Sequence, residues 1–148
     1  MYLHKTEIIH RDIKPENLLV NNDDTLKLCD FGFARTYPNP GAPLTEYVAT
    51  RWYRSPELLL TSCYAYPVDI WAIGCIMAEM IDGNALFPGD DLLDQINVIM
   101  KVCGGLTDGL LYLKSKNPDL ANIQFNITQP LETLDKKYGR KIDAKAMD

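Results

Sequence analysis

The sequence predicts a mainly helical fold with small β hairpins. Two long segments, 68–81 and 92–103, carry apolar residues at helical spacing. A shorter segment, 18–28, is typical of two strands joined by a polar turn. The chain has 148 residues, of which 47% are hydrophobic and 24% charged, so it has enough apolar side chain to bury the core of one domain.

Short elements are expected in the first 46 residues. Tyr2-Leu3-His4 is typical of the last turn of a helix, and Ile8-Ile9-His10 and Leu18-Leu19-Val20 are typical of short buried strands. Leu26-Lys27-Leu28 completes a hairpin with the second of these strands. A loop is expected over 36–46 because this segment holds Pro38, Pro40, Gly41 and Pro43.

Two longer helices follow. Residues 68–81 are apolar nearly all round, which predicts a helix buried on every face and ended by Gly83. The next helix is expected to begin at Asp90 or Asp91, whose side chain would cap the first turn, and to end at Gly104. Its apolar face holds Leu92, Leu93, Ile96, Ile99, Met100 and Cys103. Residues 106–140 are weakly patterned, and Asp143 is expected to cap a further helix.

Charge and cysteine usage exclude several classes of partner. Lys plus Arg number 15 and Asp plus Glu number 20, a net charge of -5, so no nucleic-acid partner is expected. The longest apolar segment is shorter than the ~20 residues of a bilayer span, so no membrane partner is expected either. The four cysteines form no C-x-x-C pair, and no signal peptide is visible. These features favour an intracellular protein with reduced thiols, in the cytoplasm, the nucleus or both.

Three short motifs carry the chemistry. They are His10-Arg11-Asp12-Ile13-Lys14-Pro15-Glu16-Asn17, then Asp30-Phe31-Gly32, then Ser55-Pro56-Glu57. Each alone is a modest signal, since a lone Asp followed by Asn is usually part of a turn. In this order and spacing, however, they make the sequence resemble the eukaryotic protein kinases over essentially all of residues 1–148.

The resemblance implies that residues 1–148 are a partial protein kinase domain. It corresponds to the C-terminal lobe, with the catalytic loop, the activation segment, the buried central helix, the following helix and the insert. No residues match the glycine-rich loop, the strand lysine or its glutamate partner. The resemblance therefore implies that the N-terminal lobe is absent and that both ends cut through structural elements.

The implied activity is transfer of the ATP γ-phosphate to proteins, with ATP and Mg²⁺ as cofactors. Asp12 matches the base that accepts the proton of the substrate hydroxyl. Asn17 and Asp30 match the Mg²⁺ ligands, and their oxygens suit this hard cation. Lys14 matches the phosphate-contacting lysine of serine/threonine kinases, so serine or threonine substrates are expected. Thr50 matches a residue that helps to hold the catalytic Asp and Lys in place.

The activation segment narrows the resemblance. Thr45-Glu46-Tyr47, followed by Val48 to Arg54, looks like that of the cyclin-dependent-kinase-like and mitogen-activated kinases. Thr45 and Tyr47 are therefore expected phosphorylation sites, with an upstream activating kinase as the expected partner. The alternative is that they are exposed loop residues that are never modified. The arginines that match phosphate-clasping positions are Arg11 and Arg35 for phosphothreonine, and Arg51 and Arg54 for phosphotyrosine.

Other residues are expected to be structural. Asp69 matches an aspartate that holds the catalytic-loop backbone, and His10 matches a buried scaffold histidine, with Gly32 completing the second motif. Glu57 matches a glutamate whose usual arginine partner has no counterpart here, which would leave an unpaired charge. Trp71 is expected in the core, and Cys29 as a buried inert thiol rather than a reactive one.

Two classes of function stay open. The chain is either an incomplete part of an active serine/threonine kinase or a non-catalytic lobe that acts by binding or is a relic. Small-molecule kinases share an Asp and Asn at similar spacing, but Ser55-Pro56-Glu57 and Asp69-Ile70-Trp71 are not expected in them. A lobe of this kind is also expected to expose apolar surface and to be poorly soluble.

Overall fold

The computed structural model describes residues 2–37, 50–61, 64–125 and 132–139. The expected phosphorylation sites Thr45 and Tyr47 and the helix expected at Asp143 lie outside these residues. The elements, in chain order, are α1 (Tyr2–Lys5), β1 (Ile8–Ile9), the 3-10 turn η1 (Pro15–Asn17), β2 (Leu18–Val20), β3 (Leu26–Leu28), β4 (Arg35–Thr36), α2 (Pro56–Leu60), α3 (Pro67–Asp82), α4 (Leu92–Cys103), α5 (Asp108–Ser115) and α6 (Leu134–Tyr138).

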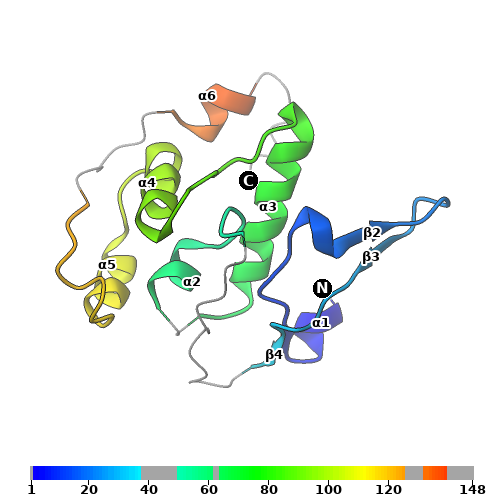
Figure 1. Ribbon diagram of the computed structural model, residues 1–148, viewed down its shortest axis with the longest axis horizontal. Coiled ribbons are helices and arrows are strands. Elements are labelled where there is room, and N and C mark those ends of the chain that lie inside the picture. The colour runs from blue at the N-terminus through cyan, green and yellow to red at the C-terminus, as the bar shows by residue number, and fades with distance from the viewer. Residues whose placement is uncertain (1, 38–49, 62–63, 126–131, 140–148) are drawn as a thin grey trace.

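The predicted class, mainly helical with small β elements, is confirmed. Helix α3 runs through the middle of the molecule, with α4 and α5 on one side and the β2–β3 hairpin on the other (Figure 1). Among the described residues, no helix has the length and apolar character needed to cross a membrane.

Helix α3 forms where the sequence predicts it. Pro67 occupies its first turn, where a missing N–H costs nothing. Gly83 ends it in the left-handed conformation, with φ 76°, and donates its N–H to the Glu79 carbonyl at 2.7 Å. The predicted residue range is therefore correct to within one residue at each end.

The expectation that this helix is buried on every face is wrong. Val68, Asp69, Ala72, Cys75 and Ala78 are buried. On another face, Ile70, Met77 and Met80 keep 53%, 49% and 81% of their surface exposed. The sequence shows that the helix is apolar on every side, but the other elements that pack against it decide which of its faces are buried.

Helix α4 is also confirmed, with one correction to its apolar face. Asp91 caps it by accepting a hydrogen bond from the Asp94 N–H at 2.8 Å. Ile96, Ile99 and Met100 are buried, whereas Leu93 and Cys103 are exposed. The buried stripe is therefore narrower than the predicted face.

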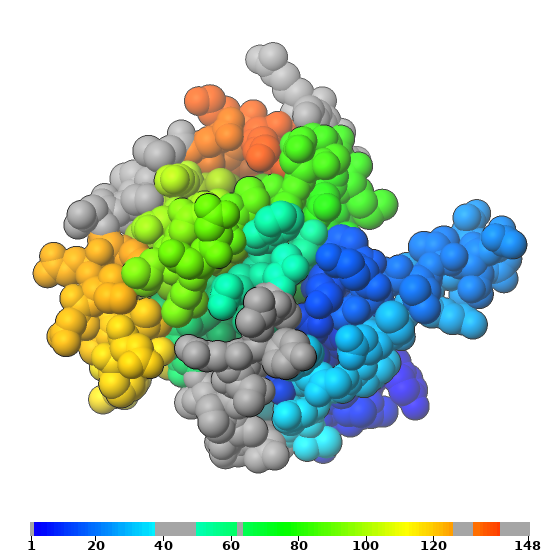
Figure 2. Space-filling model, viewed as in Figure 1, coloured from blue at the N-terminus to red at the C-terminus, as the bar shows by residue number. Residues whose placement is uncertain are grey.

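Two antiparallel strand pairs flank the catalytic loop. Strands β2 and β3 form the predicted hairpin, with Leu18 opposite Leu28. This hairpin projects from the body of the molecule (Figure 2), and Leu19 and Val20 are exposed, so the expected burial of that strand is wrong. Strand β4 was not predicted; it pairs with β1 and takes Thr36 out of the expected loop.

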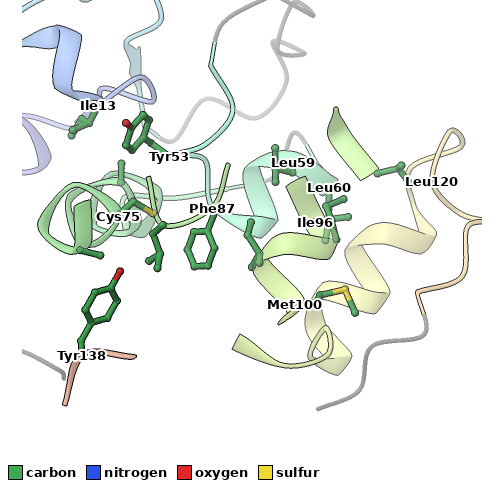
Figure 3. Packing of buried hydrophobic residues seen from close by; sticks show 14 residues of the cluster. Ile13, Tyr53, Leu59, Leu60, Cys75, Phe87, Ile96, Met100, Leu120 and Tyr138 are labelled. Atoms are coloured by element: carbon green, nitrogen blue, oxygen red, sulfur yellow. The ribbon is translucent and has the colours of Figure 1, made fainter. Parts of the chain in front are cut away.

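The main core gathers around one side of α3. Phe87 lies between Cys75 of α3 and Ile96 of α4, while Tyr138 of α6 points toward α3 (Figure 3). Trp71 packs against this core and stacks on Phe87 with ring centroids 5.5 Å apart, which confirms it as a core residue. Helices α5 and α6, both within the weakly patterned 106–140, add Leu110 and Tyr138 to this core.

Candidate active site

The predicted catalytic loop, residues 10–17, runs between β1 and β2 and is fastened to α3 by Asp69. The Asp69 carboxylate is fully buried. Its Oδ2 accepts the His10 backbone N–H at 2.9 Å, and its Oδ1 accepts the Arg11 backbone N–H at 2.8 Å. Arg11 has a left-handed φ of 68°, which a side chain other than glycine adopts only under constraint. Asp69 supplies that constraint by binding two successive N–H groups.

The loop brings three predicted site residues into direct contact. Lys14 Nζ lies 2.9 Å from Oδ2 of Asp12, and Asn17 Nδ2 donates to the same oxygen at 3.1 Å. Asn17 Nδ2 also donates to the Asp12 backbone carbonyl at 2.8 Å. Asp12 and Asn17 are buried, while Lys14 is half-buried. The η1 turn begins at Pro15 and reverses the chain so that residues 12 and 17 meet.

His10 is a fully buried scaffold residue in the structure. Its Nε2 donates to the Cys29 carbonyl at 3.1 Å, while Nδ1 accepts the Asp12 N–H at 3.4 Å. The Phe31 ring lies edge-on to the imidazole, with centroids 5.0 Å apart. Cys29 itself is half-buried, so its expected full burial is wrong.

Asp30 lies just after β3, the second strand of the hairpin, where the chain returns to the catalytic loop. The Cys29 N–H donates to the Asn17 carbonyl at 2.9 Å, which sets the residue before Asp30 against Asn17. Asp30 is exposed, with φ 57°, and its Oδ1 accepts the Gly32 N–H at 3.1 Å. A Cβ at Gly32 would lie 3.1 Å from that oxygen, so a larger residue would crowd the carboxylate.

The donor atoms fit a hard divalent cation. Asp30 offers a carboxylate, and Asn17 uses its amide nitrogen toward Asp12, which leaves its amide oxygen for another partner. Within the described part of the chain, no three His, Cys, Asp or Glu side chains cluster tightly enough to hold a metal by themselves. This pattern suits Mg²⁺, which usually takes one or two protein ligands together with substrate phosphates and water.

Three of the four predicted arginines lie close to one another, and two of them, Arg11 and Arg54, line a hollow with Asp12. Burial lowers the pKa of Arg54; the Asp12 carboxylate opposes that shift, and the charges of Arg51 and Arg11 add to it. The Arg11 side chain donates to the Phe33 carbonyl at 2.6 Å and to the Tyr64 hydroxyl. Arg35 lies on the exposed strand β4 and donates to the Ala34 carbonyl.

Thr50 and Glu57 complete the predicted set. Thr50 is exposed and lines a small hollow together with Asp12, Lys14 and Arg54. Glu57 is half-buried, and within the described residues it makes no ion pair. The Glu57 side chain is therefore only partly removed from solvent.

Sequence reasoning missed two side chains of this region. His4 Nε2 lies 2.8 Å from Asp69 Oδ2, and the Tyr64 hydroxyl meets Arg11. They stand 65 and 53 residues from their partners, and no local spacing signals either contact.

Comparison with known proteins identifies the family. The protein kinase domain family matches residues 1–136. Cyclin-dependent kinase-like 5 of Mus musculus is 49% identical over 138 residues, which is 93% of this chain and 15% of that protein. Cyclin-dependent kinase-like 2 of Homo sapiens is 49% identical over 138 residues, 93% of this chain and 28% of its own length. This chain thus spans between about a seventh and just over a quarter of these relatives. It belongs to the protein kinase family and is a cyclin-dependent-kinase-like member of it.

Proposed function

We propose that this chain provides the substrate-side half of a protein serine/threonine kinase, which transfers the γ-phosphate of ATP to hydroxyl groups of proteins. One observation carries the proposal. A single buried carboxylate oxygen of Asp12 is held by both Lys14 Nζ and Asn17 Nδ2. The helices and small antiparallel sheets fit a kinase lobe, and we assign them to the large C-terminal lobe because the three motifs belong to it.

Asp12 acts on the substrate hydroxyl. Its Oδ2 is occupied by Lys14 and Asn17, so the remaining oxygen accepts the hydroxyl proton as the hydroxyl oxygen bonds to the γ-phosphorus and the bond from that phosphorus to the departing ADP oxygen breaks. Lys14 sits beside this carboxylate with its ammonium in position to offset negative charge on the transferred phosphoryl group. Because tyrosine kinases usually lack a lysine here, we propose serine and threonine as the acceptors.

Asn17 and Asp30 are the proposed ligands of Mg²⁺. When bound with ATP, Mg²⁺ supplies positive charge to the phosphates, and these two residues give it hard oxygen ligands. The Asn17 side chain is fixed by its two bonds to Asp12, and the Asp30 carboxylate is oriented by the Gly32 N–H.

We also propose that Thr45 and Tyr47 are phosphorylated by an upstream kinase. The support is the group formed by Arg11, Arg51 and Arg54, whose positive charges interact with one another and would be offset by added phosphate groups. Thr50 and Arg35 are proposed as the positioning and clasping residues that complete this segment. Phosphopeptide mapping of the native protein tests the proposal, and finding both sites unoccupied in cells with active signalling contradicts it.

The test of the activity is phosphate transfer from labelled Mg²⁺-ATP to matched peptides that carry Ser, Thr or Tyr. Both the native protein isolated from cells and the 1–148 chain are assayed. Asp12→Asn is expected to lower kcat by about 10² to 10⁴, while Asp119→Asn, an exposed change far from the loop, leaves it unchanged. Transfer to Tyr peptides alone would refute the proposed specificity.

The catalytic proposal is refuted if the native protein transfers no phosphate. It is equally refuted if the Asp12→Asn variant has the same kcat as the parent protein. The non-catalytic alternative, a lobe that acts by binding, would then lead. Capture of ATP by the native protein without turnover is the result that would distinguish a binding role from a relic.

A further inference from the structure

His4 is connected to the catalytic loop through one buried carboxylate. It belongs to α1, and its Nε2 donates to Oδ2 of Asp69 at 2.8 Å. The same Oδ2 accepts the His10 N–H, and Oδ1 accepts the Arg11 N–H. One carboxylate therefore joins α1, α3 and the start of the catalytic loop.

The buried position of Asp69 makes its third hydrogen bond, from His4, important for the conformation of the catalytic loop. Asp69 is fully buried, so water cannot replace a missing hydrogen bond to its charge. Its carboxylate must also keep one orientation to serve two successive N–H groups, one of them on the left-handed Arg11. Asp12 follows Arg11 directly, so a tilt of Asp69 moves the backbone that carries Asp12.

The His4 ring is itself held in place. Its side chain is 14% exposed, and it lies against the Tyr66 ring with centroids 4.9 Å apart. Tyr66 in turn contacts Tyr37, whose backbone N–H donates to the Glu7 carbonyl at 2.7 Å. The imidazole therefore reaches Asp69 from a packed position.

We infer that His4 is a positioning residue, which fixes the Asp69 carboxylate and through it the His10–Asp12 backbone. The inference rests on the proposed function for its catalytic consequence, but its structural content stands apart from turnover. The positioning role requires a hydrogen-bond donor at the position of Nε2, and it does not require an imidazole ring. Gln at this position places its Nε2 the same number of bonds from Cα, whereas the amide of Asn falls one bond short.

The experiment measures backbone amide hydrogen exchange at His10 and Arg11 in the whole chain. Four variants are compared with the parent: His4→Leu, His4→Asn, His4→Gln, and Tyr2→Leu as a control at an exposed position of the same helix. Loss of a hydrogen bond to a charged group is expected to speed exchange at both amides about tenfold or more in His4→Leu and His4→Asn. His4→Gln is expected to restore the parent rate, and Tyr2→Leu to keep it.

The buried α4 amides of Ile96 and Ile99 serve as the internal reference, because they are remote from this contact in the fold. The inference is overturned if His10 and Arg11 exchange at the parent rate in His4→Leu. It is equally overturned if His4→Gln exchanges as fast as His4→Leu, or if the α4 amides accelerate by the same factor. Native protein without kinase activity refutes the proposed function and leaves these exchange rates to decide the role of His4.

A second readout applies to protein that does turn over. His4→Leu is then expected to lower kcat about tenfold with a smaller change in KM for ATP, because the Asp12 backbone moves directly, whereas Asn17 moves only through its bonds to Asp12. His4→Gln is expected to recover kcat. A change in KM alone would contradict a positioning role.

Discussion

One nitrogen atom of Asn17 makes two hydrogen bonds to Asp12: Nδ2 donates to the backbone carbonyl of Asp12 at 2.8 Å and to its carboxylate at 3.1 Å. The residue expected to serve Mg²⁺ thus also closes the catalytic loop on itself. The two proposed roles use different atoms of one side chain, the nitrogen for the loop and the oxygen for the metal.

Removal of this brace should destabilise the chain before any ligand is considered. Asn17→Ala leaves the Asp12 carbonyl without this donor and the buried Asp12 carboxylate with Lys14 alone, and we expect a loss of roughly 1–3 kcal/mol in the free energy of unfolding. Asn22→Ala, in the exposed hairpin turn, should change it by less than about 0.5 kcal/mol. Urea unfolding followed by circular dichroism checks both, and equal midpoints would contradict the bracing role.

Gly89 should tolerate no side chain. An added Cβ would lie 2.4 Å from the Cα of Gln95, whose side chain binds both sides of this turn, at the Gly89 N–H and the Phe87 carbonyl. The Gly89 carbonyl also accepts the Trp52 indole N–H at 3.0 Å. We expect Gly89→Ala to cost about 1–3 kcal/mol, measured as a lowered Tm.

The matched control for that change is Gly109→Ala. Gly109 lies inside α5 with nothing within 4 Å of an added Cβ, so alanine should be neutral there or stabilise by about 0.5–1 kcal/mol. If both variants melt alike, the crowding at Gly89 is not what limits the substitution.

Stability should fall at alkaline pH, partly through Cys75. Burial raises the pKa of this thiol from 9.0 to about 12. Above pH 9 the unfolded chain loses the thiol proton while the folded chain keeps it, so unfolding becomes more favourable as pH rises toward 12. Below pH 9 both states keep the proton, and this contribution to stability is fully present.

The measurement is the urea midpoint between pH 7.5 and 10.5. Cys75→Ala should be less stable at every pH, because it opens a small cavity, but its midpoint should fall less steeply above pH 9. Burial also raises the pKa of Tyr138 to about 12, so Tyr138→Phe should flatten the curve further at the alkaline end. Parallel curves for the parent and Cys75→Ala would rule out this source of the pH dependence.

The exposed face of α3 should drive self-association. Ile70, Met77 and Met80 present apolar side chains to solvent along one helix. Replacing Ile70 by Glu, Met77 by Gln and Met80 by Lys should reduce light scattering at high concentration without lowering Tm. A parent chain that stays monodisperse at the same concentration would contradict the expected poor solubility.

The existence and limits of the main helices are determined locally, and so the sequence predicts them. Pro67 and Gly83 bound α3, and Asp91 begins α4, because caps and backbone conformations depend on neighbouring residues. The sequence also contains start signals for α5 and α6, because Thr107 caps α5 and Thr133 caps α6. They were missed because their apolar patterns are weak.

The residue types of the candidate site are likewise written in the sequence, in three motifs whose order and spacing indicate a kinase. Tertiary structure alone decides which atoms meet. Asp69 binds His10, Arg11 and His4, contacts that span 58 to 65 residues, and no periodic pattern encodes a distance of that kind. The exposure of Ile70 and Met80 has the same origin: burial depends on what packs against a helix, and the residues of the helix do not contain that information.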